Sequence, residues 1–394
     1  MADNITLLAG TAQPVNTPFS TFSPLAVDFL DTLSRTIRAE EKGEEIAAFG
    51  FWCRRAHVEQ LKKRHNCPLP RLGRGLIFHL APSNVPTMFA YSMALGMLAG
   101  NANLIRLSQR RGEIEARLCN LIAQVLDRQE FSTLKERTAI LSCPRDSKTI
   151  SSLLAQCDGR VIWGGDETVA AVRALPMPAH AVELAFPDRW SLCILSEKAL
   201  DKMDSEQLEG LARRFYNDTY LMDQNACSSP QMVVWQADGG GKTTRKRWWD
   251  AVAEEARRRY PLGPFQAARK YERFCLAAIE TGCVEELERY GGNFLYVARL
   301  SRLPDDLTTL RGGFGLFFQW EHETLEPLLD RLTPKVQTIT CAGIDGLSLA
   351  QQLVKRQARG VARIVSVGQA LEMDTLWDGH DIIAELSRIL AVEV

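Results

Sequence analysis

Cys227 differs from most of the other cysteines in its predicted surroundings. It stands in a polar loop, Asp223 to Pro230, between a predicted helix and the apolar strand 232–235. The other cysteines fall mostly on predicted helix faces or in strands, where a small buried thiol is common. A loop cysteine near free backbone N–H groups is better placed to become a reactive thiolate. The loop therefore indicates a nucleophile, and an inert loop thiol is the alternative.

Two turns that follow predicted strands could contact a ligand. Asn84 lies in the turn 81–86, where its side-chain amide could donate a hydrogen bond; a cap for the following helix is the alternative. Gly164 and Gly165 precede a predicted helix, and free N–H groups at a helix start can bind phosphate. Asp166 as an ordinary helix N-cap explains the same residues without a ligand.

Two familiar nucleotide-binding patterns are missing. The pair Gly73 and Gly75 lacks the third glycine of a dinucleotide fingerprint. The run 239–243, Gly-Gly-Gly-Lys-Thr, lacks the first glycine of a phosphate loop, because position 236 is Gln. A cofactor would therefore have to bind in another way.

The elements that carry these residues alternate between helix and strand. Short apolar runs predict strands at 75–80, 102–107, 138–142 and 159–163, and helical spacing predicts helices at 24–42, 46–64, 87–98, 113–128, 147–155 and 167–174. Ser23 is suited to the N-cap of the first helix. Strands that alternate with helices at this spacing indicate a parallel α/β sheet. The segment 181–195 is interpreted as a crossing into a second α/β domain.

Composition excludes several other classes of protein. The chain has 394 residues, 46% of them hydrophobic, with 47 basic and 48 acidic residues. This balance gives no electrostatic reason to expect a nucleic-acid ligand, and the cysteines form neither a disulfide framework nor a metal-binding cluster. Residues 1–14 lack the features of a signal peptide, and the uncharged stretch 75–105 is broken by prolines and glycines, which argues against a membrane span. We expect a cytoplasmic protein.

Several segments, in this order, resemble the aldehyde dehydrogenase superfamily, and more closely the LuxC-type acyl-CoA reductases. The matching segments are Ala-Pro-Ser-Asn-Val-Pro at 81–86, Gly-Asn-Ala-Asn-Leu-Ile-Arg-Leu-Ser at 100–108, Trp-Gly-Gly-Asp-Glu at 163–167, Asp-Gln-Asn-Ala-Cys-Ser-Ser-Pro-Gln at 223–231, Val-Gln-Thr at 336–338 and Trp-Asp-Gly at 377–379. The resemblance implies a Rossmann-like cofactor domain at 1–196, a second α/β catalytic domain at 197–375 and a C-terminal segment at 376–394. The active site would lie between the two domains.

The resemblance also implies roles for single residues. Cys227 would attack a thioester carbonyl, and Asn84 would donate its amide to the oxyanion together with the backbone N–H of Cys227. Arg106 and Ser108 match residues that hold the adenosine ribose, and an arginine there favours NADPH, with NADH as the alternative. Gly164, Gly165 and Glu167 would lie along the cofactor. The resemblance thus implies Cys227 and Asn84 as the catalytic residues and no metal site. The cofactor-binding residues would be Arg106, Ser108, Gly164, Gly165 and Glu167.

The chain departs from oxidising members of the superfamily where their water-activating glutamate stands. The corresponding stretch is Val-Glu-Leu-Ala-Phe-Pro-Asp-Arg at 182–189, and one register puts Ala185 at that position while another puts Glu183 there. A second family glutamate is missing from 311–315. The proton donor stays open between Glu183, His180, water and a hydroxyl group.

A missing water-activating base favours reduction over hydrolysis. We expect an NADPH-dependent reduction of an acyl thioester, on CoA or on a partner protein, to the aldehyde through an acyl-cysteine. The resemblance further implies an acyl-protein synthetase as partner and a homo-oligomer. The alternatives are an aldehyde dehydrogenase that works in the oxidative direction and a non-catalytic scaffold for the synthetase. Acyl-chain length is not indicated, because Phe89 and Met93 could belong to a core or to an acyl tunnel.

Overall fold

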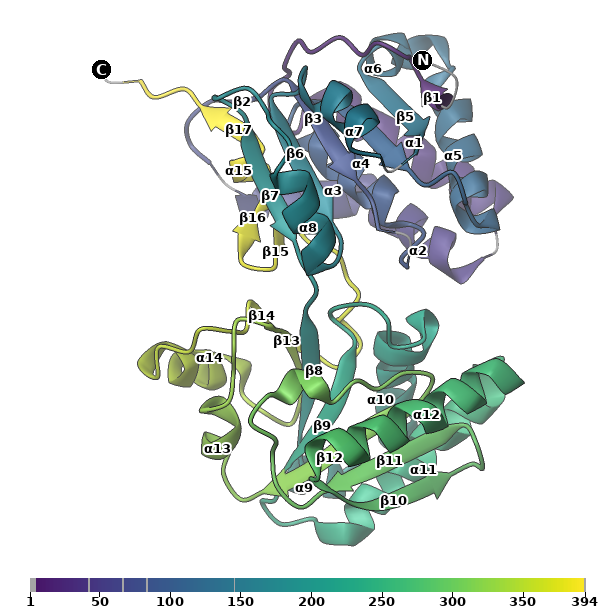
Figure 1. Ribbon diagram of the computed structural model, residues 1–394, viewed down its shortest axis with the longest axis vertical. Coiled ribbons are helices and arrows are strands. Elements are labelled where there is room, and N and C mark those ends of the chain that lie inside the picture. The colour runs from purple at the N-terminus through teal and green to yellow at the C-terminus, as the bar shows by residue number, and fades with distance from the viewer. Residues whose placement is uncertain (1–4, 42, 66, 83, 145, 393–394) are drawn as a thin grey trace. The chain divides into compact units, whose positions relative to one another are not determined.

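The computed structural model describes residues 5–41, 43–65, 67–82, 84–144, 146–392. Contacts within the chain divide it into two compact units. Unit 1 contains the described residues up to Asp188 together with those from Met373 onward, and unit 2 contains Arg189–Glu372. Both units are mixed α/β structures built around one large sheet (Figure 1).

Unit 1 has a six-stranded sheet in the order β1-β5-β4-β3-β6-β7. The strands are β1 (Thr6–Gly10), β3 (Leu76–Leu80), β4 (Ala102–Leu107), β5 (Thr138–Ser142), β6 (Gly159–Trp163) and β7 (Val182–Phe186). Only β1 runs antiparallel, so the carboxyl ends of the other five strands meet at one edge. The central strands are buried on both faces, which is why they are continuous apolar runs in the sequence.

Helices cover both faces of this sheet. The first face is covered by α1 (Pro24–Glu40), α2 (Glu44–Trp52), α3 (Arg55–His65), α4 (Met88–Leu98), α5 (Glu113–Leu126) and α15 (Ile382–Glu385), and the second by α7 (Ser147–Leu154) and α8 (Asp166–Arg173). Ser23 caps α1 through a hydrogen bond from the N–H of Ala26, as the sequence predicts. The predicted helix 46–64 is wrong in one respect, because it breaks into α2 and α3 at Cys53 and Arg54.

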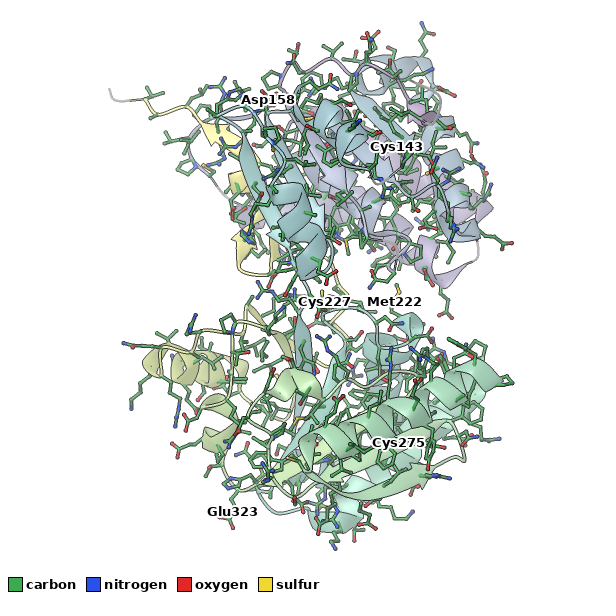
Figure 2. All side chains as sticks on the ribbon, viewed as in Figure 1. Cys143, Asp158, Met222, Cys227, Cys275 and Glu323 are labelled. Carbon is green, nitrogen blue, oxygen red and sulfur yellow. The ribbon has the colours of Figure 1, made fainter. Side chains whose placement is uncertain are left out.

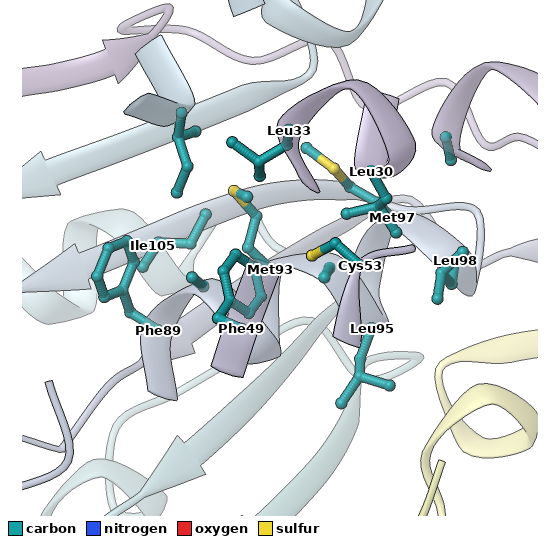
Figure 3. Close-up of a cluster of buried hydrophobic side chains, with 14 of the residues drawn as sticks. Leu30, Leu33, Phe49, Cys53, Phe89, Met93, Leu95, Met97, Leu98 and Ile105 are labelled. Atoms are coloured by element: carbon teal, nitrogen blue, oxygen red, sulfur yellow. The ribbon is translucent and has the colours of Figure 1, made fainter. Parts of the chain in front are cut away.

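Phe89 and Met93 belong to the core of unit 1. Both side chains are almost fully buried, and they share one apolar cluster with Leu30 and Leu33 of α1 and Ile105 of β4 (Figure 3). The packing of these side chains fixes α4 against the sheet, and with it the turn that carries Asn84.

The C-terminal residues complete unit 1. They form three short strands beside α15, and the last of these pairs with a short strand that directly precedes β3. These strands are β15 (Leu376–Trp377), β16 (His380–Asp381) and β17 (Ser387–Ile389), and β17 pairs antiparallel with β2 (Arg71–Gly73). Trp52 of α2 donates its indole N–H to the carbonyl of Met373 at 2.7 Å, which ties this segment to the first helices.

Unit 2 has a seven-stranded sheet in the order β10-β11-β12-β9-β8-β13-β14. The strands are β8 (Trp190–Ser196), β9 (Pro230–Gln236), β10 (Val284–Tyr290), β11 (Leu295–Leu300), β12 (Leu316–His322), β13 (Val336–Ala342) and β14 (Arg363–Ser366). All pairs are parallel except β10 with β11. The amino ends of β8, β9, β12 and β13 therefore lie along one edge.

Two apolar clusters lie on the two faces of this second sheet. One contains side chains of α9 (Glu197–Asp201), α10 (Ser205–Thr219) and α11 (Gly241–Arg259), and the other side chains of α12 (Pro264–Thr281), α13 (Glu326–Leu329) and α14 (Gly346–Lys355). Side chains alternate along β8: Leu192 belongs to one cluster and Cys193 to the other. The predicted alternation of strands and helices in two α/β regions is confirmed.

The described residues contain neither a candidate membrane-spanning helix nor a candidate metal-binding cluster. No helix among them is both long and apolar enough to cross a membrane. No group of three or more His, Cys, Asp or Glu side chains within the described part of the chain is arranged to hold a metal ion.

Candidate functional site

The carboxyl edge of the unit 1 sheet gathers the predicted cofactor residues. In the strand register, Leu80 of β3 lies opposite Arg106 of β4 on one side and Ile162 of β6 on the other. Asn84 follows β3, Ser108 follows β4, and Gly164 and Gly165 follow β6. Ligands of parallel α/β sheets bind outside the carboxyl ends of the strands, so the edge is suitable for a nucleotide.

Arg106 is a buried cation at this edge. Its side chain is 7% exposed, and Nη2 donates to the carbonyl of Cys143 at 2.8 Å. Its Nε is also buried and has no hydrogen-bond partner among the described residues. A buried donor without a partner is costly, and the positive charge of this guanidinium group is suited to an anionic ligand at the edge. The Ser108 hydroxyl accepts a hydrogen bond from the N–H of Arg110 at 3.2 Å.

The loop after β6 leaves open space at one glycine. A Cβ atom added at Gly165 would meet nothing within 4 Å, whereas one added at Gly164 would lie 3.0 Å from the side chain of Thr168. The first turn of α8 carries Asp166 and Glu167. Two carboxylates at a helix start repel a phosphate, but carboxylates accept hydrogen bonds from hydroxyl groups. This helix start therefore is better suited to a ribose than to a phosphate.

Asn84 does not occupy the N-cap position that the alternative interpretation gave it. It is exposed in a bend after β3, and α4 begins at Met88 with Thr87 as its N-cap. The burial of α4 holds the bend at the carboxyl edge. The role of Asn84 as an oxyanion donor stays a prediction.

The two named proton-donor candidates lie at the other end of the sheet. Glu183 is opposite Arg160 near the amino ends of β7 and β6, about 10 Å along the strand from its carboxyl end. His180 precedes β7 and lies 2.9 Å from Asp158, which is located just before β6 (Figure 2). Neither residue is therefore at the edge that carries Asn84.

Glu183 is held by two arginines. It accepts hydrogen bonds from Nε of Arg160 and Nε of Arg173, both at 2.7 Å. Partial burial raises the pKa of the carboxyl group, but the hydrogen bonds and charges of Arg173 and Arg160 outweigh burial, and the net pKa is lowered. An ionised, doubly paired carboxylate is a poor proton donor and a poor general base at neutral pH.

Cys227 lies in unit 2, at the edge where β8 and β9 begin (Figure 2). The loop 223–229 connects η2 (Tyr220–Met222) with β9. The N–H of Ser229 donates to the carbonyl of Ala226 at 3.0 Å, so Cys227 sits within a tight turn. The loop starts with two left-handed residues, Asp223 at φ 52° and Gln224 at φ 59°. Such backbone costs on the order of 1–3 kcal/mol per residue and occurs often at functional sites.

Two buried glutamines hold this loop in place. The Gln224 side chain donates to the carbonyls of Pro230 and Leu316, at 3.2 and 3.0 Å, and accepts from the N–H of Gly315 at 2.9 Å. Gln231 donates to the carbonyl of Gln224 at 2.8 Å. These contacts tie both ends of the loop to the chain before β12.

The surroundings of the cysteines separate Cys227 from most of the others. Burial raises the pKa of the thiols of Cys119 and Cys157 to about 12. Burial also raises the pKa of four further thiols, those of Cys53, Cys143, Cys193 and Cys341. Cys227 is half-buried in its polar loop. Thiols with a raised pKa are weak nucleophiles at neutral pH.

Sequence reasoning missed the residues that hold the loop 223–229. Gln224 and Gln231 belong to the segment 223–231 that carries the resemblance, but their spacing did not reveal what they contact. Ser191 donates to the carbonyl of Cys227 at 2.7 Å, and no sequence signal marks that serine.

Comparisons with known proteins agree with this architecture. The acyl-CoA reductase (LuxC) family model matches residues 54–274. The chain is 27% identical over 175 residues to a long-chain acyl-protein thioester reductase of Vibrio harveyi, and 25% identical over 185 residues to one of Aliivibrio fischeri. The matches cover 44% and 46% of this chain and 34% and 36% of those relatives, so the chain spans about a third of the length of the curated relatives that it matches.

Solved structures share the fold at low sequence identity. Lactaldehyde dehydrogenase from Escherichia coli has a TM-score of 0.63 and 13% identity, and the match covers 94% of this chain and 87% of that one. For 1-pyrroline-5-carboxylate dehydrogenase from Thermus thermophilus the TM-score is 0.61 and the identity 12%, over 94% of this chain and 81% of that one. The predicted aldehyde dehydrogenase-like fold is confirmed. Because the family model matches more than half of its residues, the chain belongs to the acyl-CoA reductase (LuxC) family.

Proposed function

We propose that this protein reduces an acyl thioester to an aldehyde with NADPH, through an acyl-enzyme on Cys227. The observation that carries the proposal is the loop 223–229: a half-buried cysteine at a strained, doubly anchored turn, in a chain that belongs to a family of acyl-CoA reductases. A thiol placed in this way is suited to nucleophilic catalysis.

The first half-reaction would load the cysteine. The Cys227 thiolate attacks the thioester carbonyl carbon, and the backbone N–H of Cys227 and the amide of Asn84 donate to the oxyanion. The bond between the carbonyl carbon and the departing sulfur then breaks, and the leaving thiolate takes up a proton. One oxyanion donor contributes roughly 3–4 kcal/mol of transition-state stabilisation in comparable sites.

The second half-reaction would release the aldehyde. A nicotinamide cofactor, when bound, supplies the hydride that converts the acyl-cysteine into a hemithioacetal. Collapse of the hemithioacetal breaks the bond between Sγ of Cys227 and the carbonyl carbon and returns the electron pair to sulfur. Overall the reaction consumes one proton, which ends on the thiol that left in the first step.

The residues at the carboxyl edge of unit 1 fit a nicotinamide dinucleotide. The positive charge of the Arg106 guanidinium group is suited to a 2′-phosphate, which favours NADPH over NADH. Ser108 and the carboxylate of Glu167 would bind ribose hydroxyls. The open space at Gly165 would let the cofactor approach the main chain closely. These assignments use chemistry that the residues present can supply.

The state of Glu183 supports reduction rather than oxidation. An oxidising enzyme needs a base that activates water against the acyl-cysteine, and Glu183 is paired with two arginines at the amino end of β7. Without such a base, the acyl group survives on the sulfur until it is reduced. The names of the two curated relatives support a long-chain acyl group carried on a protein as the donor, and an acyl-activating synthetase would then be the partner.

The decisive test is the mass of the intact protein after it is mixed with short-, medium- and long-chain acyl-CoAs without nucleotide. We expect an acyl adduct on Cys227 that is discharged as aldehyde when NADPH is added. Cys227→Ala should abolish the adduct, while Cys275→Ala, which removes another half-buried thiol, should leave it unchanged. An adduct that hydrolyses to the acid without cofactor would replace the proposal by the oxidative reaction. Turnover that persists in Cys227→Ala would refute the nucleophile.

A further inference from the structure

Ser191 connects the loop 223–229 to two strands of unit 2. It is the second residue of β8 and is fully buried. Its hydroxyl donates to the carbonyl of Cys227 at 2.7 Å and accepts from the N–H of Thr338, in β13, at 3.1 Å. The hydroxyl therefore forms both of its hydrogen bonds with backbone groups, and one of these groups is the carbonyl of Cys227 itself.

The two peptide groups on either side of the α-carbon of Cys227 are both anchored. The peptide before it is held by the hydrogen bond from the N–H of Ser229 to the carbonyl of Ala226, and the peptide after it by Ser191. In a trans peptide the C=O and N–H groups point in opposite directions. Fixing the Ala226 carbonyl therefore fixes the direction of the Cys227 N–H, which is the proposed oxyanion donor.

The other anchors act elsewhere on the loop. Gln224 and Gln231 hold its start and its end, and Tyr260 donates its hydroxyl to the Asp223 carboxylate. Ser191 instead fixes the residue that would attack the substrate. It does so from an interior strand of the sheet, because β8 is hydrogen-bonded on both sides, to β9 and β13.

We propose that Ser191 is a positioning residue that orients Cys227 for attack on a thioester, an inference that rests on the proposed function. Without its hydroxyl, the carbonyl of Cys227 loses its anchor, and the α-carbon that carries Sγ can shift relative to the carbonyl group under attack. Misplacement of about 1 Å in a reacting group can lower a rate roughly 100-fold. Acyl transfer therefore depends on Ser191, while simple access to the thiol does not.

Ser196 provides a matched control on the same strand. It is also buried, and its hydroxyl likewise both donates and accepts, to Asp238 at 2.7 Å and from the N–H of Ala199 at 3.1 Å. It lies five residues away along β8, roughly 16 Å from Ser191. Ser191→Ala and Ser196→Ala thus remove equivalent hydroxyls from the two ends of one strand.

The experiment compares two reactions of Cys227 in the full chain. One is acyl loading from the acyl-CoA that loads the unmodified protein fastest, followed by intact mass; the other is alkylation by iodoacetamide, quantified on the Cys227 peptide. We expect Ser191→Ala to slow acyl loading roughly 10- to 100-fold and to change alkylation by no more than a few-fold. Ser196→Ala should leave both rates near those of the unmodified protein.

The outcomes separate the two proposals. If the unmodified protein loads acyl groups on Cys227 neither from acyl-CoA nor from an acylated carrier protein, the proposed function fails and the role of Ser191 falls with it. If it loads and Ser191→Ala loads at the same rate, only the role of Ser191 is refuted; equal losses in Ser191→Ala and Ser196→Ala refute it too. Should the alanine variant not fold, Ser191→Thr and Ser191→Val replace it, because they share one shape and differ in the hydroxyl. Thr should then load faster than Val, and equal rates would refute the proposal.

Discussion

Arg106 combines a structural contact and a predicted binding role in one guanidinium group. One of its nitrogens donates to the Cys143 carbonyl and so joins the ends of β4 and β5, while its buried Nε has no partner among the described residues. A charge kept in this state at a strand end is more easily explained by a ligand than by stability, because an unpaired buried donor destabilises a fold.

Arg106→Gln is therefore expected to weaken NADPH binding more than NADH binding. The variant loses the positive charge that, in the proposed function, would face a 2′-phosphate, and a hydrogen bond to a charged group contributes roughly 1.5–3 kcal/mol. That range corresponds to roughly 10- to 100-fold in the dissociation constant. Nucleotide titration followed by fluorescence measures both constants without turnover. NADH is the internal control, and an equal loss for both nucleotides would assign Arg106 to the fold alone.

At the candidate site, residue type and loop context predict some members and not others. Cys227 is identifiable because a cysteine in a polar loop is unusual, and Asn84 because its turn follows a strand. Ser191 and Gln224 are not identifiable in the same way, because both act on partners brought near only by strand pairing. Ser191 and Cys227 are 36 residues apart in the chain, and no local pattern encodes their contact.

At the scale of elements, the amino and carboxyl ends of the unit 1 strands do different work. The carboxyl edge carries the predicted cofactor residues. The amino ends are braced by ionic contacts: Arg160 of β6, 7% exposed, also donates to the carbonyl of Val172 at the end of α8 at 2.8 Å. Glu183 thus links the edge strand β7 to β6 and, through Arg173, to α8.

Replacement of Glu183 by Gln should lower stability and leave acyl loading unchanged. The carboxylate's pKa is lowered in the fold, so its contribution to stability is present above the unfolded-state value near 4.5 and is lost as the pH falls through the folded-state pKa. We expect a loss of about 1–2 kcal/mol at neutral pH, most of it from Arg160, because Arg173 is largely exposed. Urea unfolding at neutral and acidic pH measures the loss, which should shrink in acid.

Glu254→Gln is the matched control for this variant. Glu254 pairs with Arg257 on the exposed side of α11, where an ion pair contributes little to stability, so no measurable change is expected. A large drop in acid formation or acyl loading in Glu183→Gln, with stability unchanged, would instead restore Glu183 as a catalytic base.

Elements with clear apolar periodicity are predictable from the sequence, whereas elements whose buried residues are few or polar are not. The spacing 25–37 identifies α1, and the short apolar run 102–107 identifies β4. By contrast, α12 fully buries only Lys270 and Ala277, while its Phe265, Leu276 and Ile279 are exposed, so its apolar residues do not mark one buried face. β13 buries Gln337 and Thr338, and polar residues of this kind are typical of loops when the sheet around them is unknown.

At the scale of the whole molecule, the chain passes between its two units twice, after Asp188 and after Glu372. The second passage begins at a turn held by Asp218 of α10, which accepts the N–H groups of Gly368 at 2.6 Å and Ala370 at 2.9 Å. Asp218 is 1% exposed. The return of 373–392 to unit 1 is not predictable from the sequence, because it depends on such distant contacts.

Asp218→Asn should destabilise the protein more at about pH 5 than at about pH 8. Burial raises the pKa of Asp218 to about 7 despite the hydrogen bonds from Gly368 and Ala370; Glu372 raises it further and Arg363 opposes this. The folded protein then holds a proton that the unfolded chain, with a pKa near 3.8, releases. The stability contributed by this proton is complete below pH 3.8 and is lost as the pH rises through 7.

Urea unfolding, followed by tryptophan fluorescence at both pH values, gives the difference between the variant and the unmodified protein, and at a given pH the other titrating groups cancel. Glu206→Gln, at an exposed position in the same helix, should give a difference that does not change with pH. Equal losses for Asp218→Asn at pH 8 and at pH 5 would mean that the buried carboxyl group is anionic throughout this range, because the folded and unfolded states would then both be ionised. The turn that starts the return to unit 1 would then be held by charge, and acid would loosen it instead of tightening it.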